Sequence, residues 1–276
     1  MFQYIKERFP LYIGIPLAAI LFVAPNEGII VLTKLITGIF SFFIILLSIR
    51  FFDDYFDIET DCIKSPKRGL VKGIINANNV IFQLIILFLI VLIIQGCNWF
   101  SIVFILLLLF WHSLYFLIKK HILVVFHPFI INAVFFVFPA YTALIQNKPI
   151  TTSTIIWGTF FFFAVVGHDY GHSINENLAN KKIHDLNTSL NPQKLVLLST
   201  LFYVLSFVSG CFIFTLINSN LFLNVLIIMG IFVSYILIQI WIEPCENNAK
   251  KLYVPGFLFF IIPSIVNIII QYLNHK

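Results

Sequence analysis

Long apolar segments, separated by short polar ones, run along the whole chain. Each is close to the roughly twenty residues that an α-helix needs to cross the hydrocarbon core of a bilayer. The segments predict nine transmembrane helices, at 10–24, 29–52, 75–96, 98–118, 122–144, 151–168, 192–216, 221–243 and 252–273. The pattern therefore predicts an all-α, polytopic membrane protein with a single domain over residues 1–276.

The polar connections alternate in length and charge. Short ones, such as PNEG (25–28) and QNKP (146–149), lie on one side of the predicted membrane, and longer charged ones lie on the other. With the amino terminus in the cytoplasm, fourteen of the 17 Lys and Arg residues fall inside and three outside. Because positive charge concentrates in cytoplasmic loops, we expect a cytoplasmic amino terminus and an odd number of spans.

Composition excludes a water-soluble fold. Hydrophobic residues make up 60% of the chain and charged residues 11%, with a mean hydropathy of +1.00, whereas soluble domains carry about 25% charged residues. The positive-inside distribution accounts for most of the net charge of +5, so no nucleic-acid partner is expected. We expect an integral protein of a bacterial inner membrane, in contact with membrane lipids.

One polar segment, FFDDYFDIETDCIKSPKRGLVKG (51–73), concentrates acidic residues between two apolar segments. At 100° per residue, four aspartates would share one helix face within about 100°, whereas Glu59 would point away. Oxygen ligands without His or Cys suit a hard cation such as Mg²⁺. The candidate metal ligands of this segment are Asp53, Asp54, Asp57 and Asp61.

The same segment continues with cations that can hold phosphate oxygens: Lys64, Lys67 and Arg68. Arg68 has a second possible role, which is to tie the loop to the aspartates. The simpler interpretation of the whole segment is a solvated charged loop. The one-face spacing of the aspartates, next to lipid-buried helices, favours a functional site.

A second polar cluster, GHDYGHSINENLANKK (167–182), follows the sixth predicted span. Its side chains share one helix face but include only two carboxylates, Asp169 and Glu176, so it predicts a weaker metal site. The cluster can also be explained as a polar helix cap. A third feature, LYFLIKK (114–120), places Tyr115 and Lys119 four residues apart, which suits phosphate binding or a lysine and tyrosine at the membrane surface.

DDYFDIETD followed by PKRGLVKG resembles the first aspartate-rich motif of the UbiA superfamily of intramembrane prenyltransferases. Asp54, Asp57 and Asp61 match its three aspartates, and Asp53 stands where Asn is usual. Tyr115 and Lys119 resemble the YxxxK element of the family. In the second motif, which is usually DxxxD, an alignment on Thr188 puts Glu176 and Asn180 at the two aspartate positions, so this motif departs from the pattern.

The resemblance implies a UbiA-like bundle of nine transmembrane helices around a central cavity. It implies Mg²⁺-dependent transfer of a prenyl group from a polyprenyl diphosphate to a small acceptor, for which an aromatic molecule is one candidate. The implied roles are metal binding by the four aspartates with Glu176 and Asn180, acceptor deprotonation or related catalysis by Asp169, His172 and Glu176, and diphosphate binding by Lys64, Lys67, Arg68, Tyr115, Lys119 and Lys181.

Of three other functions, the pattern is compatible with the first two and opposes the third. A membrane terpene cyclase would ionise a prenyl diphosphate without an external acceptor, and the altered second motif favours this alternative. A non-catalytic member would bind an isoprenoid lipid. A transporter would require paired charges deep within the spans, whereas nearly all carboxylates of this chain lie at predicted span ends.

Overall fold

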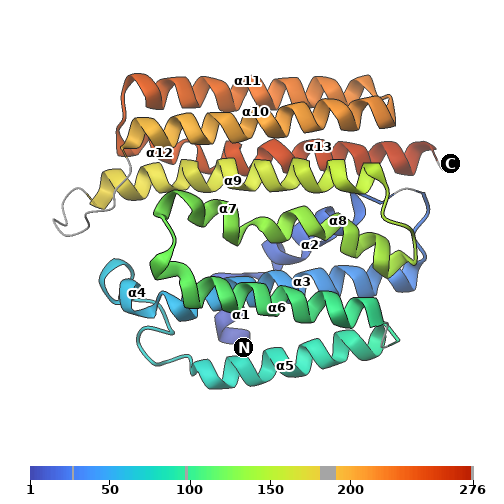
Figure 1. Ribbon diagram of the computed structural model, residues 1–276, viewed down its shortest axis with the longest axis horizontal. Helices are drawn as coiled ribbons and strands as arrows, with labels where there is room; N and C mark the ends of the chain where they lie inside the picture. Colours follow the sequence, from blue (N-terminus) through green and yellow to red (C-terminus); the bar gives the residue numbers. More distant parts are fainter. Residues whose placement is uncertain (27, 97–98, 181–190, 275–276) are drawn as a thin grey trace. The chain divides into compact units, whose positions relative to one another are not determined.

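The computed structural model describes residues 1–26, 28–96, 99–180 and 191–274, and in these ranges every regular element is a helix (Figure 1). The chain divides into two compact units, the first comprising Met1–Val23, Ile29–Ile118 and Tyr141–Lys148, and the second Ala24–Gly28, Lys119–Ala140 and Pro149–Lys276. The all-α prediction is confirmed for the described residues. The expectation of a single domain stays a prediction.

The first unit is organised around one long helix, α3. It packs against α2, α4, α5 and α6, and Figure 1 shows α3, α5 and α6 side by side. The side chains of Phe42 and Phe51 on α3 are fully buried. The helices of this unit are α1 (Phe2–Arg8), α2 (Leu11–Val23), α3 (Leu32–Phe56), α4 (Ile58–Lys64), α5 (Ala77–Ile94) and α6 (Trp99–Ile118).

The second unit is built on α9, which packs along α10, α12 and α13. The hydroxyl of Ser199 on α10 donates to the carbonyl oxygen of Gly167 on α9 at 2.7 Å. A Cβ at Gly167 would lie only 3.2 Å from the Tyr203 ring, so glycine permits this close approach of the two helices.

The helices of the second unit include two short 3₁₀ turns near its beginning, and α8 divides between the units after Ala140. The elements are η1 (Lys119–His121), η2 (Val124–Phe126), α7 (His127–Ile131), α8 (Ala133–Gln146), α9 (Thr152–Asn180), α10 (Pro192–Ile217), α11 (Asn220–Ile242), α12 (Glu246–Lys250) and α13 (Tyr253–Asn274).

Each of the nine predicted spans coincides with a helix or, at 122–144, with the pair α7 and α8. Within the described ranges, seven helical segments are long and apolar enough to cross a membrane, among them the combined segment His127–Gln146. The apolar α2 is shorter, with 13 residues, and α9 carries the polar cluster in its carboxyl-terminal half. Nine crossings and a cytoplasmic amino terminus therefore stay predictions.

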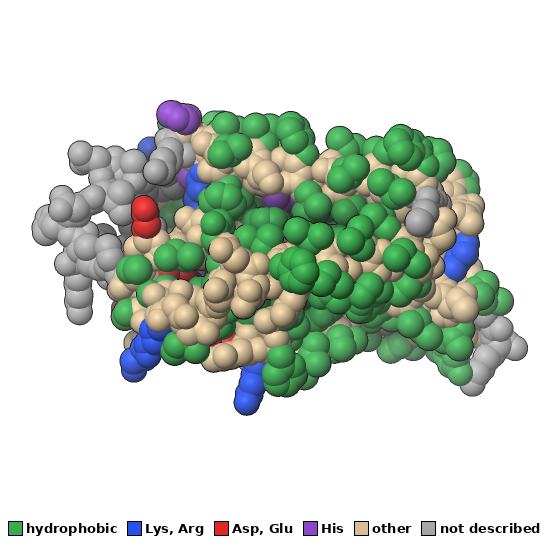
Figure 2. Space-filling model, turned by 90° about the horizontal axis from the view of Figure 1, so that it is seen from below, with side chains coloured by type: hydrophobic (Ala, Val, Ile, Leu, Met, Phe, Trp, Pro, Cys, Tyr) green, Lys and Arg blue, Asp and Glu red, His purple; other side chains and the backbone are tan. Residues whose placement is uncertain are grey.

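Large apolar side chains remain exposed on the outer faces of these helices. Ile93 on α5 is 68% exposed and Ile231 on α11 is 66% exposed. Figure 2 shows hydrophobic side chains over most of the face in view, with few charged side chains among them. Apolar exposure on this scale suits contact with lipid rather than water.

Candidate active site

The first aspartate-rich segment lies where α3 ends and α4 begins. The two helices are separated by Asp57 alone, which caps both. The N–H of Asp57 donates to the carbonyl oxygen of Asp53 at 3.1 Å, and the N–H of Asp61 donates to that of Asp57 at 2.7 Å. The interruption is therefore short, and it differs from the single continuous helix that the spacing predicts.

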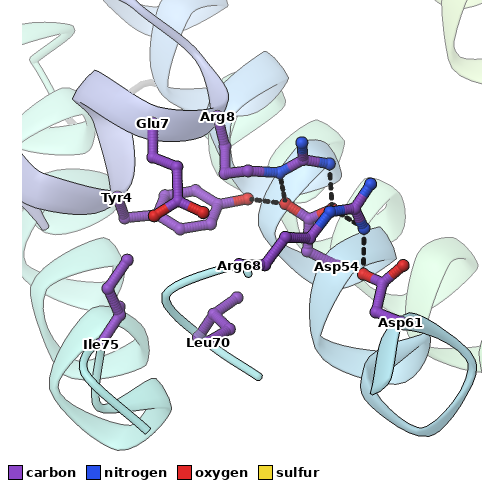
Figure 3. A pocket seen from close by; sticks show the side chains of 8 residues that line it. All are labelled: Tyr4, Glu7, Arg8, Asp54, Asp61, Arg68, Leu70 and Ile75. Atoms are coloured by element: carbon purple, nitrogen blue, oxygen red, sulfur yellow. Dashed lines mark hydrogen bonds and ion pairs between the residues drawn. The ribbon is translucent and has the colours of Figure 1, made fainter. Parts of the chain in front are cut away.

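Asp54 is the most buried carboxylate of this segment, with 2% of its surface exposed. Arg8 donates to it through two bonds, Nε to Oδ2 and Nη2 to Oδ1, each of 2.7 Å. The phenol of Tyr4 donates to Oδ2 at 2.8 Å. Arg50 and Arg68 reach Oδ1 at 3.3 and 3.6 Å. Asp54 is thus held by residues from α1, α3 and the loop after α4 (Figure 3).

The loop after α4 is tied to both the aspartates and the amino-terminal helix. Arg68 donates to Asp61, which is also buried. The carboxylate of Glu7 on α1 accepts from the backbone N–H of Gly69 at 2.9 and 3.2 Å. Arg68 therefore has the tying role that the sequence allows, and α1 is docked on the same loop.

Burial and charge keep the partners of Asp54 in their donor forms. Burial raises the pKa of the Tyr4 phenol, and the negative charge of Asp54 raises it further. Burial alone would lower the pKa of Arg8, but the hydrogen bonds and charge of Asp54 outweigh that effect and raise it overall. Both side chains therefore remain protonated donors at neutral pH.

An open pocket of about 450 Å³ adjoins this cluster. Three cationic side chains line it, namely Arg8, Lys67 and Arg68, together with Ser65 and Pro66. Within the described residues no carboxylate lines this pocket. Its charge and size, in the range of small-molecule sites, suit an anionic ligand.

The fit of a metal ion to the first motif is poor in this arrangement. Among the described residues, no three His, Cys, Asp or Glu side chains are grouped so as to hold a metal. Asp54 and Asp61 bond to guanidiniums, and Asp53 pairs with Arg50 at 3.2 Å. A cation at Asp54 would have to share the carboxylate oxygens with these donors, so we assign no chemical step to a metal.

The second polar cluster occupies the last turns of α9. The amide of Asn132, at the junction of α7 and α8, donates to Oδ2 of Asp169 at 2.6 Å. The hydroxyl of Ser173 donates to the carbonyl oxygen of Asp169 at 2.9 Å. The carboxylate of Asp169 is therefore oriented by a neutral amide donor that lies 37 positions earlier in the chain.

The histidines of α9 lie against the start of α13. The His172 ring stacks on Tyr253, with centroids 4.7 Å apart and planes 14° apart, and Asn175 donates to the Tyr253 hydroxyl at 2.8 Å. His168 Nδ1 and the Tyr203 hydroxyl are buried without a hydrogen-bond partner among the described residues. Both atoms border the backbone of Gly256.

The remaining predicted site residues lie in several elements. Tyr115 is buried on α6, which ends at Ile118, so Lys119 begins the 3₁₀ turn η1 rather than continuing the helix. Lys64 ends α4, and Glu176 and Asn180 belong to α9, but their side chains are outside the described part of the structure. Lys181 and Thr188 also lie outside the described residues.

Several site residues are not among the predictions from sequence. Tyr4, Glu7 and Arg8 lie in a seven-residue helix without an apolar run, 46 to 62 positions from their partners. Asn132 lies inside a predicted span. A polar residue within an apolar segment is a signal that could have marked Asn132, whereas nothing near Arg8 in sequence indicates its partner.

Comparisons with known proteins identify a family and a similar solved structure. The model of the UbiA prenyltransferase family matches residues 13–262. A solved structure from work on digeranylgeranylglyceryl phosphate synthase in membranes is similar over 97% of this chain and 95% of that chain, with a TM-score of 0.67 and 19% identity. At this identity the likeness shows the fold. No curated protein matches in sequence.

Proposed function

This chain belongs to the UbiA prenyltransferase family, and from this premise we propose that it transfers a prenyl group from a polyprenyl diphosphate to a small acceptor within the membrane. Family membership and the seven apolar helices make it an integral membrane protein. The observation that carries the proposal is the basic pocket of Arg8, Lys67 and Arg68 beside the first aspartate-rich motif. Such a pocket suits the diphosphate of the donor substrate.

The cations would act where negative charge develops. As the allylic C–O bond breaks, the leaving diphosphate gains charge, and fixed donors directed at it lower the barrier. Arg68 is pre-oriented by Asp61, and Lys67 lies on the same loop. We assign Lys64, Tyr115, Lys119 and Lys181 to the same diphosphate-binding role on the resemblance to the family.

The prenyl chain would lie among aromatic side chains. In the first unit, Tyr141 stacks on Phe104 with centroids 4.2 Å apart, and on Phe42 at 5.7 Å. Aromatic faces attract cations, so such side chains would stabilise an allylic carbocation and exclude water from it.

Activation of the acceptor is assigned to the end of α9. A general base must lie within hydrogen-bonding reach of the proton that it removes, and Asp169 is oriented for this role by Asn132. His172 and Glu176 are the other candidates. The acceptor is proposed to be a small molecule, and an aromatic compound is the first class to test. The name of the structural neighbour adds a prenylated glyceryl phosphate as a second class to test.

Mg²⁺ remains the proposed cofactor on the resemblance to the family, which implies Asp53, Asp54, Asp57, Asp61, Glu176 and Asn180 as ligands. Of these, Asp53, Asp57, Glu176 and Asn180 stay the proposed ligands. The ion pairs of Asp54 with Arg8 and of Asp61 with Arg68 oppose a direct role for these two carboxylates. Turnover measured in Mg²⁺ and in a chelator tests the cofactor.

The proposed location is a bacterial inner membrane, with the site facing the cytoplasm.

The test uses the full chain purified in detergent, shown to be folded by circular dichroism. Prenyl diphosphates of increasing chain length are supplied with Mg²⁺, with no acceptor, with a phenolic acid, or with a prenylated glyceryl phosphate. We expect release of inorganic diphosphate that depends on an acceptor, together with a prenylated product in mass spectrometry.

Two outcomes would contradict prenyl transfer. Acceptor-independent release with a cyclised hydrocarbon would assign the protein to terpene cyclisation instead. No release from folded protein at any chain length would indicate a non-catalytic isoprenoid-binding protein.

A further inference from the structure

The ion pairs of the first motif reverse the role expected for its aspartates. We propose that Arg8, Lys67 and Arg68 form an anion-binding site that takes a diphosphate directly, with no metal ion between it and Asp54, and that Asp54 and Asp61 serve to orient the two guanidiniums. The identification of the anion as the diphosphate of the donor substrate depends on the proposed function; the direct anion site does not.

Asp54 is held by three short hydrogen bonds. Its two oxygens accept two bonds from Arg8 and one from Tyr4, each of 2.7 to 2.8 Å, and it is 2% exposed. A buried carboxylate loses its hydration, so it requires such partners. Replacing them by a metal would leave the Arg8 guanidinium, whose side chain is 17% exposed, without its counter-ion. Holding Arg8 is therefore the role that the geometry assigns to Asp54.

Each guanidinium keeps donors for a second partner. Arg8 uses Nε and Nη2 for Asp54, and Arg68 uses Nη1 for Asp61. Nη1 of Arg8, and Nε and Nη2 of Arg68, have no hydrogen-bond partner among the described residues. Figure 3 shows the two guanidiniums next to each other above Asp54, and both residues line the open pocket.

The chemistry of these groups matches a phosphate. A guanidinium is planar and binds phosphate oxygens through two parallel N–H bonds. Arg8 and Arg68 both approach Oδ1 of Asp54, at 2.7 and 3.6 Å, so their like charges repel and an incoming anion would offset that repulsion. Because the aspartates already fix the guanidiniums, little side-chain freedom remains to be lost on binding.

Lys67 and Ser65 complete the pocket. Lys67 is exposed on the loop after α4 and forms no ion pair with a described residue, so its ammonium group is available to the anion. Ser65 lines the same pocket and carries a hydroxyl that can donate to an anion. The pocket thus combines three cations and a hydroxyl in about 450 Å³, with no carboxylate on the wall formed by the described residues.

The amino-terminal helix becomes part of the binding site. Arg8 ends α1, and α1 is fastened by Tyr4 to Asp54 and by Glu7 to the backbone of Gly69. Lys6 lies on the same helix but is exposed. A change of charge at Lys6 therefore provides a matched control for a change of charge at Arg8.

The experiment is calorimetric titration of inorganic diphosphate into the full chain in detergent, once with Mg²⁺ and once with a chelator. We expect binding in both conditions. Arg8→Gln should weaken it by about tenfold or more, because a charge-assisted hydrogen bond is lost. The affinity of Arg8→Lys for diphosphate should lie between those of the unmodified chain and Arg8→Gln. Lys6→Gln should bind diphosphate as the unmodified chain does.

Lys67→Gln provides a second test if Arg8→Gln does not fold. Lys67 pairs with no aspartate among the described residues, so its replacement leaves no buried carboxylate without a partner. This substitution should also weaken binding about tenfold. Binding that disappears in the chelator would show that a metal bridges the anion to the aspartates. Arg8→Gln or Lys67→Gln proteins that bind like Lys6→Gln would exclude the direct site.

Failure of this inference is distinguishable from failure of prenyl transfer, because the titration requires no turnover. If the protein binds diphosphate without metal but transfers no prenyl group, the direct anion site is supported and the proposed function is contradicted. If the protein transfers prenyl groups but binds diphosphate only with Mg²⁺, the proposed function is supported and the direct anion site is contradicted.

Discussion

Asp54 is 2% exposed, yet three guanidiniums and one phenol reach its two oxygens. Burial of a lone carboxylate is unfavourable by several kcal/mol, and removal of one partner from a buried pair costs about 3–5 kcal/mol. The ion pairs of Asp54 therefore have two effects. They stabilise the junction of α1 with α3, and they hold the Arg8 side chain at the pocket.

Asp54→Asn is expected to lower the free energy of unfolding by about 3–5 kcal/mol, because Arg8 and Arg68 lose their shared counter-charge. It should also abolish turnover, since Arg8 would no longer be oriented. Glu59 is exposed on α4, so Glu59→Gln should leave both properties nearly unchanged. Thermal unfolding in detergent and release of diphosphate measure the two effects. Equal and small effects of both substitutions would contradict the role of Asp54.

Tyr4→Phe removes one donor from Asp54 and is expected to destabilise the protein by about 1.5–3 kcal/mol. The pKa of the Tyr4 phenol is raised by burial and by Asp54, so this bond is fully present below the ordinary tyrosine pKa of about 10 and is lost only above it. The difference in Tm between the two proteins should therefore be constant from about pH 6 to pH 9. A difference that declines within this range would contradict the assignment.

At the scale of helices, the apolar pattern predicted nine segments, and each coincides with helical structure. The pattern succeeds because a helix that faces lipid or a core must be apolar along its whole length. Two interruptions of these helices were not predicted. The fifth segment is divided at Asn132, and the helix that begins with α3 is interrupted at Asp57.

The amino-terminal helix α1 was not predicted. Its seven residues, FQYIKER, are too few and too polar to give a periodic signal, and its stability comes from tertiary contacts with Asp54 and Gly69. The aspartates of the first motif were recognisable because their spacing is local. Their arginine partner was not, since Arg8 lies 46 positions from Asp54 and only the folded chain brings them together.

Asn132→Ala tests the link between the α7–α8 junction and α9. The substitution removes the amide that donates to Asp169 at 2.6 Å, so the carboxylate loses its orientation. We expect kcat for transfer to fall by about tenfold, with the Kd for inorganic diphosphate unchanged.

Ser173→Ala is the matched control on α9, because among the described residues its hydroxyl bonds only to a backbone carbonyl in the same helix. Its turnover should stay close to that of the unmodified chain. A similar loss of turnover in both variants would indicate a general effect on α9 rather than a role for Asp169.

At the scale of the whole molecule, the charge distribution predicts which side of the membrane carries the first motif. Cys62 on α4 is exposed and lies within this segment. A membrane-impermeant thiol reagent should therefore label it in inside-out vesicles and not in intact cells. Cys62→Ser provides the control for labelling at other cysteines. Labelling from the outside of intact cells would reverse the predicted orientation.

Fold class, family and the first motif could be derived from the sequence because apolar length and carboxylate spacing are properties of single segments. The roles of Glu176 and Asn180 could not, since the altered motif departs from the family pattern. The engagement of Asp54 and Asp61 by arginines also could not, because a carboxylate spacing that suits a metal suits guanidiniums equally well.

Prenyl transfer is tested by measuring the product and the leaving group together. Purified protein in liposomes is given a radiolabelled polyprenyl diphosphate and an acceptor, and both the prenylated product and the released diphosphate are quantified. We expect one diphosphate to be released for each product formed, with neither detected for Asp54→Asn. Folded, unmodified protein that forms no product and releases no diphosphate at any chain length would contradict prenyl transfer.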